Sequence, residues 1–414
     1  MNDILRRVAD EFGTPCYVYF MDQVRDRVAG VRAAFGDRFR ISFAVKSNPN
    51  HGLLQRMLGV VDALDVSSVG EVARAMAAGW APGQLGFTGP GKTAAELQAA
   101  VQASVGEMIV ESQAEAELLD AIAGRAGRRQ RILVRIAPRK VPRGFGLNMS
   151  GKPSQFGIDE EAIDPALEAI QALPHLELCG FHIYSGTQCL KAEAIVENFA
   201  IFIDVFTRVC RTHRVTPQRL IFGAGFGIPY YENDTPVELA AIAEGTNALL
   251  DALKADTEFS GTELMLESGR YLVGEAGVYL TRVVRKKHSR GTDICICDGG
   301  MHHHLAAAGH LGSVVQRNYQ IFKITGDTPQ AAEQGYNLVG PLCTTIDTLG
   351  RQVKFSGLDA GDVIGIRCSG AYGPTASPIH FISHAPPREI IVDSVQGRLC
   401  ISDATQFDEA GEVR

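Results

Sequence analysis

The sequence lacks the features that mark membrane proteins, nucleic-acid-binding proteins and disulfide-rich secreted proteins. Its 414 residues contain no apolar run long enough to span a bilayer, and the start of the chain leads to no apolar signal segment. The net charge of −7 offers no basic footprint for nucleic acid. The nine cysteines form no CxxC pair, which favours reduced thiols over a disulfide framework. We therefore expect a cytoplasmic protein with neither a membrane nor a nucleic-acid partner.

The residues that are present suit a large globular protein. Hydrophobic residues make up 45% of the chain and charged residues 21%, which is typical of a protein with a substantial core. Short apolar segments alternate with helical patterns over roughly 250 residues, which predicts parallel βα units. About eight such units favour a closed (β/α)8 barrel over an open doubly wound sheet. The eight predicted strands are Arg40–Lys46, Val61–Ser67, Gln84–Thr88, Glu107–Glu111, Arg131–Ile136, Leu178–Tyr184, Arg219–Gly223 and Glu263–Glu267.

The pattern changes after Gly274, where short strands are separated by Gly, Pro and Asp turns. This predicts an antiparallel β region, a sandwich or barrel, with few helices. We expect one domain over residues 22–275 and a second domain formed by residues 1–21 and 276–414. The early strand around Tyr17 precedes the barrel, and we expect it to return and pair with the second domain.

Lys46 stands at the end of the first predicted barrel strand, and Asn48-Pro49-Asn50 forbids that strand to continue. The active site of such a barrel lies at the carboxyl ends of its strands. A partly desolvated lysine at this place can be an amine nucleophile that forms a Schiff base with a carbonyl cofactor. The alternative is a strand-end lysine that extends to solvent.

A phosphate site is predicted at the last two strand ends. Successive glycines in Gly223-Ala224-Gly225-Phe226-Gly227 let backbone N–H groups converge on an anion, and Arg270 adds a guanidinium. A lysine for an aldehyde together with a phosphate cradle indicates pyridoxal 5'-phosphate (PLP), and Glu267 could then face the pyridine nitrogen.

Other polar residues at the strand ends leave alternatives open. His182 could stack on the cofactor ring or could be an ordinary hydrogen-bonded core histidine. Asp65 could orient Lys46 or pair with Arg135. In the second domain, the turn around Cys343 presents a thiol and Tyr372 is flanked by glycine, although both residues could be purely structural. The histidines at 302–304 point different ways and no carboxylate cluster completes a site, so we expect no metal.

Several motifs then occur in an order and spacing that identify a family. They are Phe43-Ala44-Val45-Lys46-Ser47-Asn48, Asp65-Val66-Ser67-Ser68-Val69-Gly70-Glu71, Ser154-Gln155-Phe156-Gly157, His182-Ile183-Tyr184-Ser185-Gly186, Gly223–Gly227, Glu267–Arg270, Gly340–Cys343 and Ala371-Tyr372. On these motifs the chain resembles the PLP-dependent decarboxylases of the alanine-racemase-like barrel fold (PLP fold type III), which include diaminopimelate, ornithine and arginine decarboxylases. The resemblance covers essentially the whole chain and indicates the diaminopimelate branch.

The resemblance implies roles for individual residues. Lys46 holds PLP as a Schiff base, Glu267 meets the pyridine nitrogen and His182 stacks on the ring. Decarboxylation then passes through a quinonoid, which Cys343 from a partner subunit protonates, so that the enzyme is a homodimer with shared active sites. Asp347 joins Lys46, His182 and Cys343 as a candidate catalytic residue. The candidate cofactor-binding residues are Lys46, Asp65, Arg135, His182, Ser185, Gly225, Phe226, Gly227, Glu267, Gly269, Arg270 and Tyr372.

Two departures from the family pattern concern the substrate. Thr344 stands where diaminopimelate and ornithine decarboxylases carry an acid, and Leu305–Ala308 stands where diaminopimelate decarboxylases carry an Arg-Pro pair. Without these charges, a buried ammonium or carboxylate at the far end of the substrate would lack a partner. We therefore expect an amino acid with a capped or carrier-protein-bound distal group. The alternatives are diaminopimelate decarboxylase proper, an amino-acid racemase on the same fold, and an inactive regulatory binding protein.

Overall fold

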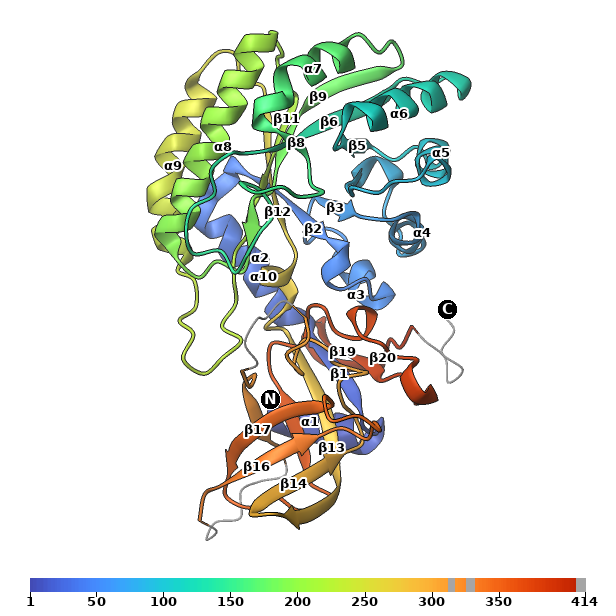
Figure 1. Ribbon diagram of the computed structural model, residues 1–414, viewed down its shortest axis with the longest axis vertical. Helices are drawn as coiled ribbons and strands as arrows, with labels where there is room; N and C mark the ends of the chain where they lie inside the picture. Colours follow the sequence, from blue (N-terminus) through green and yellow to red (C-terminus); the bar gives the residue numbers. More distant parts are fainter. Residues whose placement is uncertain (312–316, 325–331, 407–414) are drawn as a thin grey trace.

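The computed structural model describes residues 1–311, 317–324 and 332–406 of the chain. Its two main parts lie along one long axis (Figure 1). A barrel ringed by helices occupies one end and a twisted sheet occupies the other. No helix in the described ranges is long and apolar enough to cross a membrane.

The first part is a closed barrel of eight parallel strands, as the sequence predicts. Each strand pairs in parallel with its neighbours in the order β5-β4-β3-β2-β12-β11-β9-β6, and pairing of β5 with β6 closes the ring. A short strand, β8 (Ile158–Asp159), extends the ring beside β6. The barrel strands are β2 (Arg40–Ala44), β3 (Ala63–Val66), β4 (Leu85–Phe87), β5 (Glu107–Val110), β6 (Gln130–Ala137), β9 (Leu176–Ile183), β11 (Arg219–Gly223) and β12 (Glu263–Ser268).

Helices cover the outside of the barrel because each presents an apolar stripe to the strands. The stripe of α8 carries the aromatic rings of Phe199, Phe202 and Phe206, which pack around Phe222 of β11. The helices of this part are α2 (Met21–Phe35), α3 (His51–Arg56), α4 (Val69–Ala77), α5 (Ala94–Ala103), α6 (Gln113–Arg125), α7 (Ile163–Gln171), α8 (Ala192–His213), α9 (Leu239–Ala255) and α10 (Arg270–Val273).

The second part is one nine-stranded sheet with α1 (Asn2–Glu11) packed against it. The predicted return of the early strand is confirmed, because β1 lies between β13 and β19. The sheet is mixed rather than purely antiparallel, since β1 pairs in parallel with β19 and β14 pairs in parallel with β16. Its strands are β1 (Cys16–Phe20), β13 (Gly277–Ser289), β14 (Thr292–Cys297), β15 (Ile321–Lys323), β16 (Gln334–Val339), β17 (Thr348–Phe355), β18 (Val363–Ile366), β19 (Arg388–Val395) and β20 (Arg398–Asp403).

The end of β2 shows how local sequence positions the lysine. The strand stops at Ala44, and a single 3-10 turn over Val45–Ser47 follows. The side chain of Asn50 then accepts a hydrogen bond from the backbone N–H of Leu53 and caps α3. The turn and the capped helix fix Lys46 at the carboxyl end of the barrel.

Candidate active site

Lys46 lies between two buried carboxylates. Its amine Nζ is 3.3 Å from Oδ2 of Asp65, and the charge of Glu267 also acts on it. Burial lowers the pKa of Lys46, but the two carboxylates outweigh burial and raise it above its usual value. The lysine side chain is still 42% exposed. An aldehyde can therefore reach this amine, and Asp65 is the nearest group that could take its proton.

Glu267 and His182 meet inside the barrel mouth. Nε2 of His182 lies 2.9 Å from Oε2 of Glu267, and both side chains are buried. Burial raises the pKa of Glu267, but the hydrogen bond and charge of His182 lower it more, to about 2. Glu267 is thus a stable anion at neutral pH, as a partner for a protonated pyridine nitrogen needs to be. Nδ1 of His182 is buried without a hydrogen-bond partner among the described residues.

The predicted phosphate cradle is formed by two loops that lie against each other. Gly225 has a left-handed backbone (φ +64°), and a Cβ there would lie 2.7 Å from the carbonyl oxygen of Gly186. The N–H groups of Gly225 and Phe226 donate no hydrogen bond to any described residue. Ser185 is buried next to this turn with its hydroxyl unpartnered. These free donors suit a phosphate.

Arg270 completes the cradle from the next strand end. Its guanidinium is hydrogen-bonded to the hydroxyl of Tyr230 and lies 4.6 Å from the ring centre of Tyr372, while Nε has no partner in the described structure. Tyr372 donates its backbone N–H to the carbonyl of Ser47. A Cβ on Gly269 would lie 2.9 Å from the hydroxyl of Ser47, so this close approach requires glycine.

Three of the predicted cofactor-binding residues, Arg135, Phe226 and Gly227, contact other parts of the protein. The guanidinium of Arg135 pairs with Glu111 at 3.1 Å and lies 4.8 Å from the ring centre of Phe156, so its ion-pair partner is Glu111 and not Asp65. The ring of Phe226 packs into the aromatic core against Tyr271, which leaves only its backbone for the cradle. Gly227 donates its N–H to the carbonyl of Cys189.

Cys343 is exposed and lies on the loop between β16 and β17, in the second part of the chain. Asp347 anchors that loop: its buried carboxylate accepts the backbone N–H groups of Met301 (2.7 Å) and Leu342 (2.9 Å). Burial raises the pKa of Asp347, and the two amides oppose that shift. These contacts hold the Cys343 loop, and the catalytic role suggested for Asp347 by the sequence stays a prediction.

The histidines at 302–304 are buried in the second part of the chain. His304 contacts the hydroxyl of Ser369 at 2.9 Å, and His303 contacts the carbonyl of Ala385 at 2.9 Å. Both ring nitrogens of His302 lack a partner among the described residues. Within those residues, no group of three or more His, Cys, Asp or Glu side chains could hold a metal.

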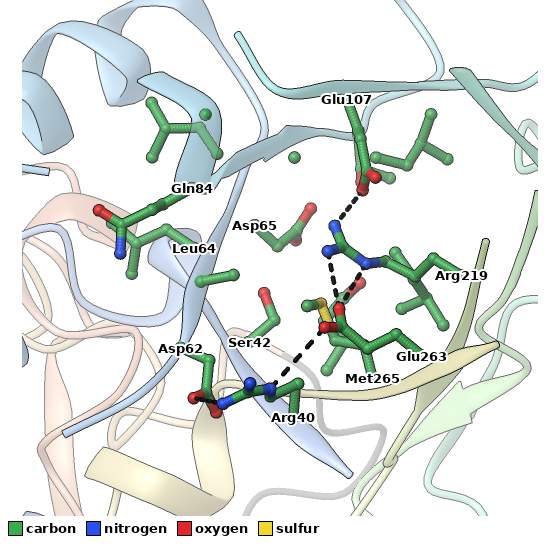
Figure 2. A pocket seen from close by; sticks show the side chains of 18 residues that line it. Arg40, Ser42, Asp62, Leu64, Asp65, Gln84, Glu107, Arg219, Glu263 and Met265 are labelled. Atoms are coloured by element: carbon green, nitrogen blue, oxygen red, sulfur yellow. Dashed lines mark hydrogen bonds and ion pairs between the residues drawn. The ribbon is translucent and has the colours of Figure 1, made fainter. Parts of the chain in front are cut away.

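A cavity of about 330 Å³ extends down the barrel interior from Asp65 and Glu267 (Figure 2). Three neighbouring strands line it with the small residues Ser42, Ala63 and Gly86, where barrels of this type usually carry bulky ones. Figure 2 shows the charged floor of this cavity, where Arg219 bridges Glu107 and Glu263. The cavity leaves room beneath the two carboxylates.

The residues at the barrel mouth fit PLP. The test is the set of buried polar atoms that lack partners in the described structure, because such atoms are costly unless a ligand or water satisfies them. Four such atoms belong to the predicted site residues: Oδ1 of Asp65, Nδ1 of His182, Oγ of Ser185 and Nε of Arg270. The hydroxyl of Ser185 and Nε of Arg270 are donors that suit a phosphate. The amine of Lys46 suits the aldehyde, and the carboxylate of Glu267 suits the ring nitrogen.

Three neighbours of the site were not among the predicted residues. The ring centre of Tyr184 is 6.0 Å from the amine of Lys46, and Tyr230 orients Arg270. Glu71 accepts the N–H of Ser67 at 2.7 Å, and burial raises its pKa to about 7. Tyr184 and Glu71 lie within motifs that the sequence analysis quotes. Tyr230, seven residues past the end of β11, had no comparable signal.

Comparison with known proteins gives the family. The pyridoxal binding domain of pyridoxal-dependent decarboxylases matches residues 21–274. An L-glutamyl-[BtrI acyl-carrier protein] decarboxylase from Niallia circulans is 33% identical, over 92% of this chain and 89% of that protein. A 2-[(L-alanin-3-ylcarbamoyl)methyl]-2-hydroxybutanedioate decarboxylase from Staphylococcus aureus is 29% identical, over 90% and 93%.

Comparison with solved structures finds proteins of the same family. The crystal structure of a diaminopimelate decarboxylase from Helicobacter pylori complexed with L-lysine superposes with a TM-score of 0.80 at 26% identity, over 95% of this chain and 93% of that one. The alanine-racemase-like barrel, the decarboxylase activity and the PLP cofactor expected from the sequence are confirmed by these matches. The chain belongs to the pyridoxal-dependent decarboxylases.

Proposed function

We propose that this enzyme removes the α-carboxyl group of an amino acid derivative whose distal end is capped or attached to a carrier protein. The observation that carries this proposal is that Thr344 and Leu305–Ala308, which stand at the two places where related decarboxylases carry charge for a distal amine or carboxylate, have no charged side chain. Leu305 packs with Met301, Ala308 and Leu342 in a small apolar cluster at the base of the Cys343 loop, and Thr344 follows the cysteine. An unpaired ammonium or carboxylate buried here would cost several kcal/mol.

The named relatives support the same substrate class. The Niallia circulans protein acts on a glutamyl group held by an acyl-carrier protein, and the substrate named for the Staphylococcus aureus protein carries an amide beyond its amino acid end. In both substrates a neutral bond joins the amino acid to the rest of the molecule, although the Staphylococcus aureus substrate ends in a butanedioate with two carboxylates. A neutral distal pocket suits such a bond.

The residues of the site have defined tasks in this proposal. Bound PLP supplies an electron sink for the electron pair that the departing carboxyl group leaves behind. Lys46 binds the cofactor aldehyde, and Asp65, 3.3 Å away, orients the amine and takes its proton. Glu267 holds the proton on the pyridine nitrogen, and His182 fixes the Glu267 carboxylate at 2.9 Å. Ser185, the Gly225 turn, Arg270 and Tyr372 hold the phosphate.

The exposed Cys343 needs a second subunit in this proposal. We place its thiol in the active site of the partner, where it would donate a proton to the substrate carbon after carbon dioxide leaves. The enzyme is then a homodimer with shared sites, in the cytoplasm. We also assign the barrel domain to residues 22–275 and the β domain to residues 1–21 and 276–414.

A carbon dioxide release assay tests the substrate class. The purified enzyme is given L-glutamate, meso-diaminopimelate, a γ-amide of L-glutamate and a glutamyl thioester of phosphopantetheine. We expect kcat/KM to be at least about tenfold higher for the amide or thioester. A loss of about 1.4 kcal/mol of free energy from an unpaired charge is enough to lower an equilibrium constant tenfold. Equal or better turnover of meso-diaminopimelate would make the enzyme a diaminopimelate decarboxylase.

A matched variant checks the same pocket. Thr344→Glu restores an acid after the catalytic cysteine, whereas Thr344→Val changes only the hydroxyl. We expect the glutamate variant alone to gain activity on substrates with a distal amine. No gain in the glutamate variant would show that residue 344 does not face the distal group. Release of a racemised amino acid without carbon dioxide would instead support the racemase alternative.

A further inference from the structure

The loop from residue 138 to residue 157, between β6 and β8, covers the phosphate side of the active site. The backbone N–H of Met149 donates to the carbonyl of Ser185 (2.7 Å), and that of Gly146 donates to Thr187 (2.9 Å). β7 (Leu147–Asn148) of this loop pairs with β10 (Gly186–Thr187), directly after the serine. The loop therefore forms part of the rim of the site.

This loop is strongly basic in an acidic chain. Residues 138–157 include Arg139, Lys140, Arg143 and Lys152 and no acidic residue, although the whole chain has a net charge of −7. Arg139 pairs with Glu161 at 3.3 Å and Lys140 pairs with Glu197. Arg143 and Lys152 are exposed, and neither pairs with an acid in the described ranges.

Lys191 adds, from the neighbouring segment, a third cation that pairs with no acid among the described residues. It is exposed, and its Cδ lies 3.3 Å from where a Cβ on Gly144 would stand, so it adjoins the turn that carries Arg143. Between the cations, Leu147 is 44% exposed. We call Arg143, Lys152 and Lys191 the rim cations. They combine positive charge with an exposed apolar side chain, which is a common composition for a surface that binds an acidic protein.

We propose that the rim cations form the docking surface for an acidic carrier protein that delivers a tethered amino acid to Lys46. This inference rests on the proposed function, because it gives the carrier-bound form of the substrate a place to dock. The carrier must lie at the mouth of the site so that its arm can reach inward. A chain of net charge −7 repels an acidic partner, and local positive charge at the mouth both offsets that repulsion and orients the partner.

Binding of the PLP-loaded enzyme to a phosphopantetheinylated acyl-carrier protein tests the docking surface without using turnover. The affinity is measured by titration at low and at physiological salt for the wild type, Arg143→Glu, Lys152→Glu and the double variant. Lys287→Glu is the matched control, because Lys287 is an exposed lysine of β13 with no ion pair to any described residue. We expect affinity to fall tenfold or more in the double variant, to fall with salt in the wild type, and to be unchanged in Lys287→Glu.

Turnover of the γ-amide of L-glutamate is measured in the same variants. We expect it to be unchanged, because a small substrate needs no docking surface. Equal loss in the Arg143 and Lys287 variants would overturn the docking surface and leave the proposed function standing. Loss of turnover on the small substrate would assign the rim cations to the substrate pocket instead. Equally tight binding of a single-stranded oligonucleotide would show only a general attraction for polyanions.

Discussion

The protonation of Lys46 is set by two opposing effects, because the residue is partly buried and also lies beside two carboxylates. Burial disfavours its charged form, while Asp65 and Glu267 favour it, and the carboxylates prevail. The amine is therefore charged in the absence of a ligand and needs a nearby base before it can react. Asp65 is suited to that task because burial and the charge of Glu267 raise the pKa of its own carboxyl.

Substitution of Lys46 separates its chemical role from its electrostatic one. Lys46→Arg keeps a cation beside Asp65 but cannot condense with an aldehyde, whereas Lys46→Ala removes both properties. We expect both variants to lose the visible absorption of the attached cofactor and the decarboxylase activity. Borohydride treatment followed by peptide mass analysis checks the assignment, since the wild type should carry the cofactor on residue 46. Cofactor trapped on another lysine would exclude this role.

Cys343 differs from the other candidates because it is exposed, on a loop in the second part of the chain. We expect Cys343→Ala to bind PLP as tightly as the wild type, because no predicted phosphate or ring contact is lost. Its turnover should fall or yield a product with altered protonation. The measurement combines cofactor titration with carbon dioxide release and product analysis in deuterated water. Unchanged rate and unchanged product would remove Cys343 from the reaction.

At the scale of elements, the barrel could be predicted because its strands repeat one simple pattern. Each barrel strand is a short, mainly apolar segment, so β11 (Arg219–Gly223) matches its predicted range and the other strands agree within two residues at either end. The strands predicted after Gly274 were Val278–Val284, Asp293–Cys297, Tyr319–Ile324, Tyr336–Val339, Asp362–Arg367 and Glu389–Asp393. They did not include β17 or β20, because the sequences of these two strands mix charged and apolar residues and several of their side chains are exposed. Such edge strands depend on pairing with distant residues, which a local pattern does not reveal.

The pairing of site residues could be predicted only in part, because it depends on which strands are neighbours. Arg135 of β6 pairs with Glu111 because β5 and β6 are adjacent, while β4 and β5 separate Asp65 of β3 from β6. The amides that hold Asp347 come from Met301 and Leu342, and Met301 is 46 residues away in the chain. Strand ends therefore indicated which residues gather at the site but not which of them pair.

β19 carries a buried acid that should make stability depend on pH. Glu389 accepts a hydrogen bond from Tyr19 at 2.9 Å, and burial raises the pKa of Glu389 to about 7. A carboxyl whose pKa is raised in the folded state binds its proton more tightly there than in the unfolded chain. Its contribution is fully present below the unfolded pKa of about 4.5 and is lost as pH rises to about 7.

Glu389→Gln tests this contribution, because glutamine is neutral throughout that range. We expect the free energy of unfolding of the wild type, relative to the variant, to fall by up to about 3 kcal/mol between pH 4.5 and 7. Urea denaturation at several pH values measures the difference. Asp22→Asn, an exposed acid of α2, serves as a control that should leave the pH profile unchanged. Parallel profiles for Glu389→Gln and the wild type would show that the pKa of Glu389 is the same in the folded and unfolded states.

At the scale of the whole molecule, Lys46 follows a barrel strand, whereas Cys343 lies on a loop of the second part of the chain. The residues proposed to hold PLP gather around Lys46, whereas the proposed proton donor stands on the exposed loop between β16 and β17. If each site takes its lysine from one subunit and its cysteine from the other, two different inactive subunits can together form one intact site. A symmetric dimer has two such sites.

Mixing Lys46→Ala with Cys343→Ala therefore tests the shared site directly. In an equal mixture, half of the dimers are hybrids, and each hybrid carries one site with both residues intact. We expect about a quarter of the wild-type activity to return after subunit exchange, since a symmetric dimer has two equivalent sites. Each variant alone, exchanged with itself, is the control. If the two residues instead act within one chain, no hybrid contains an intact site, and the mixture stays as inactive as its parents.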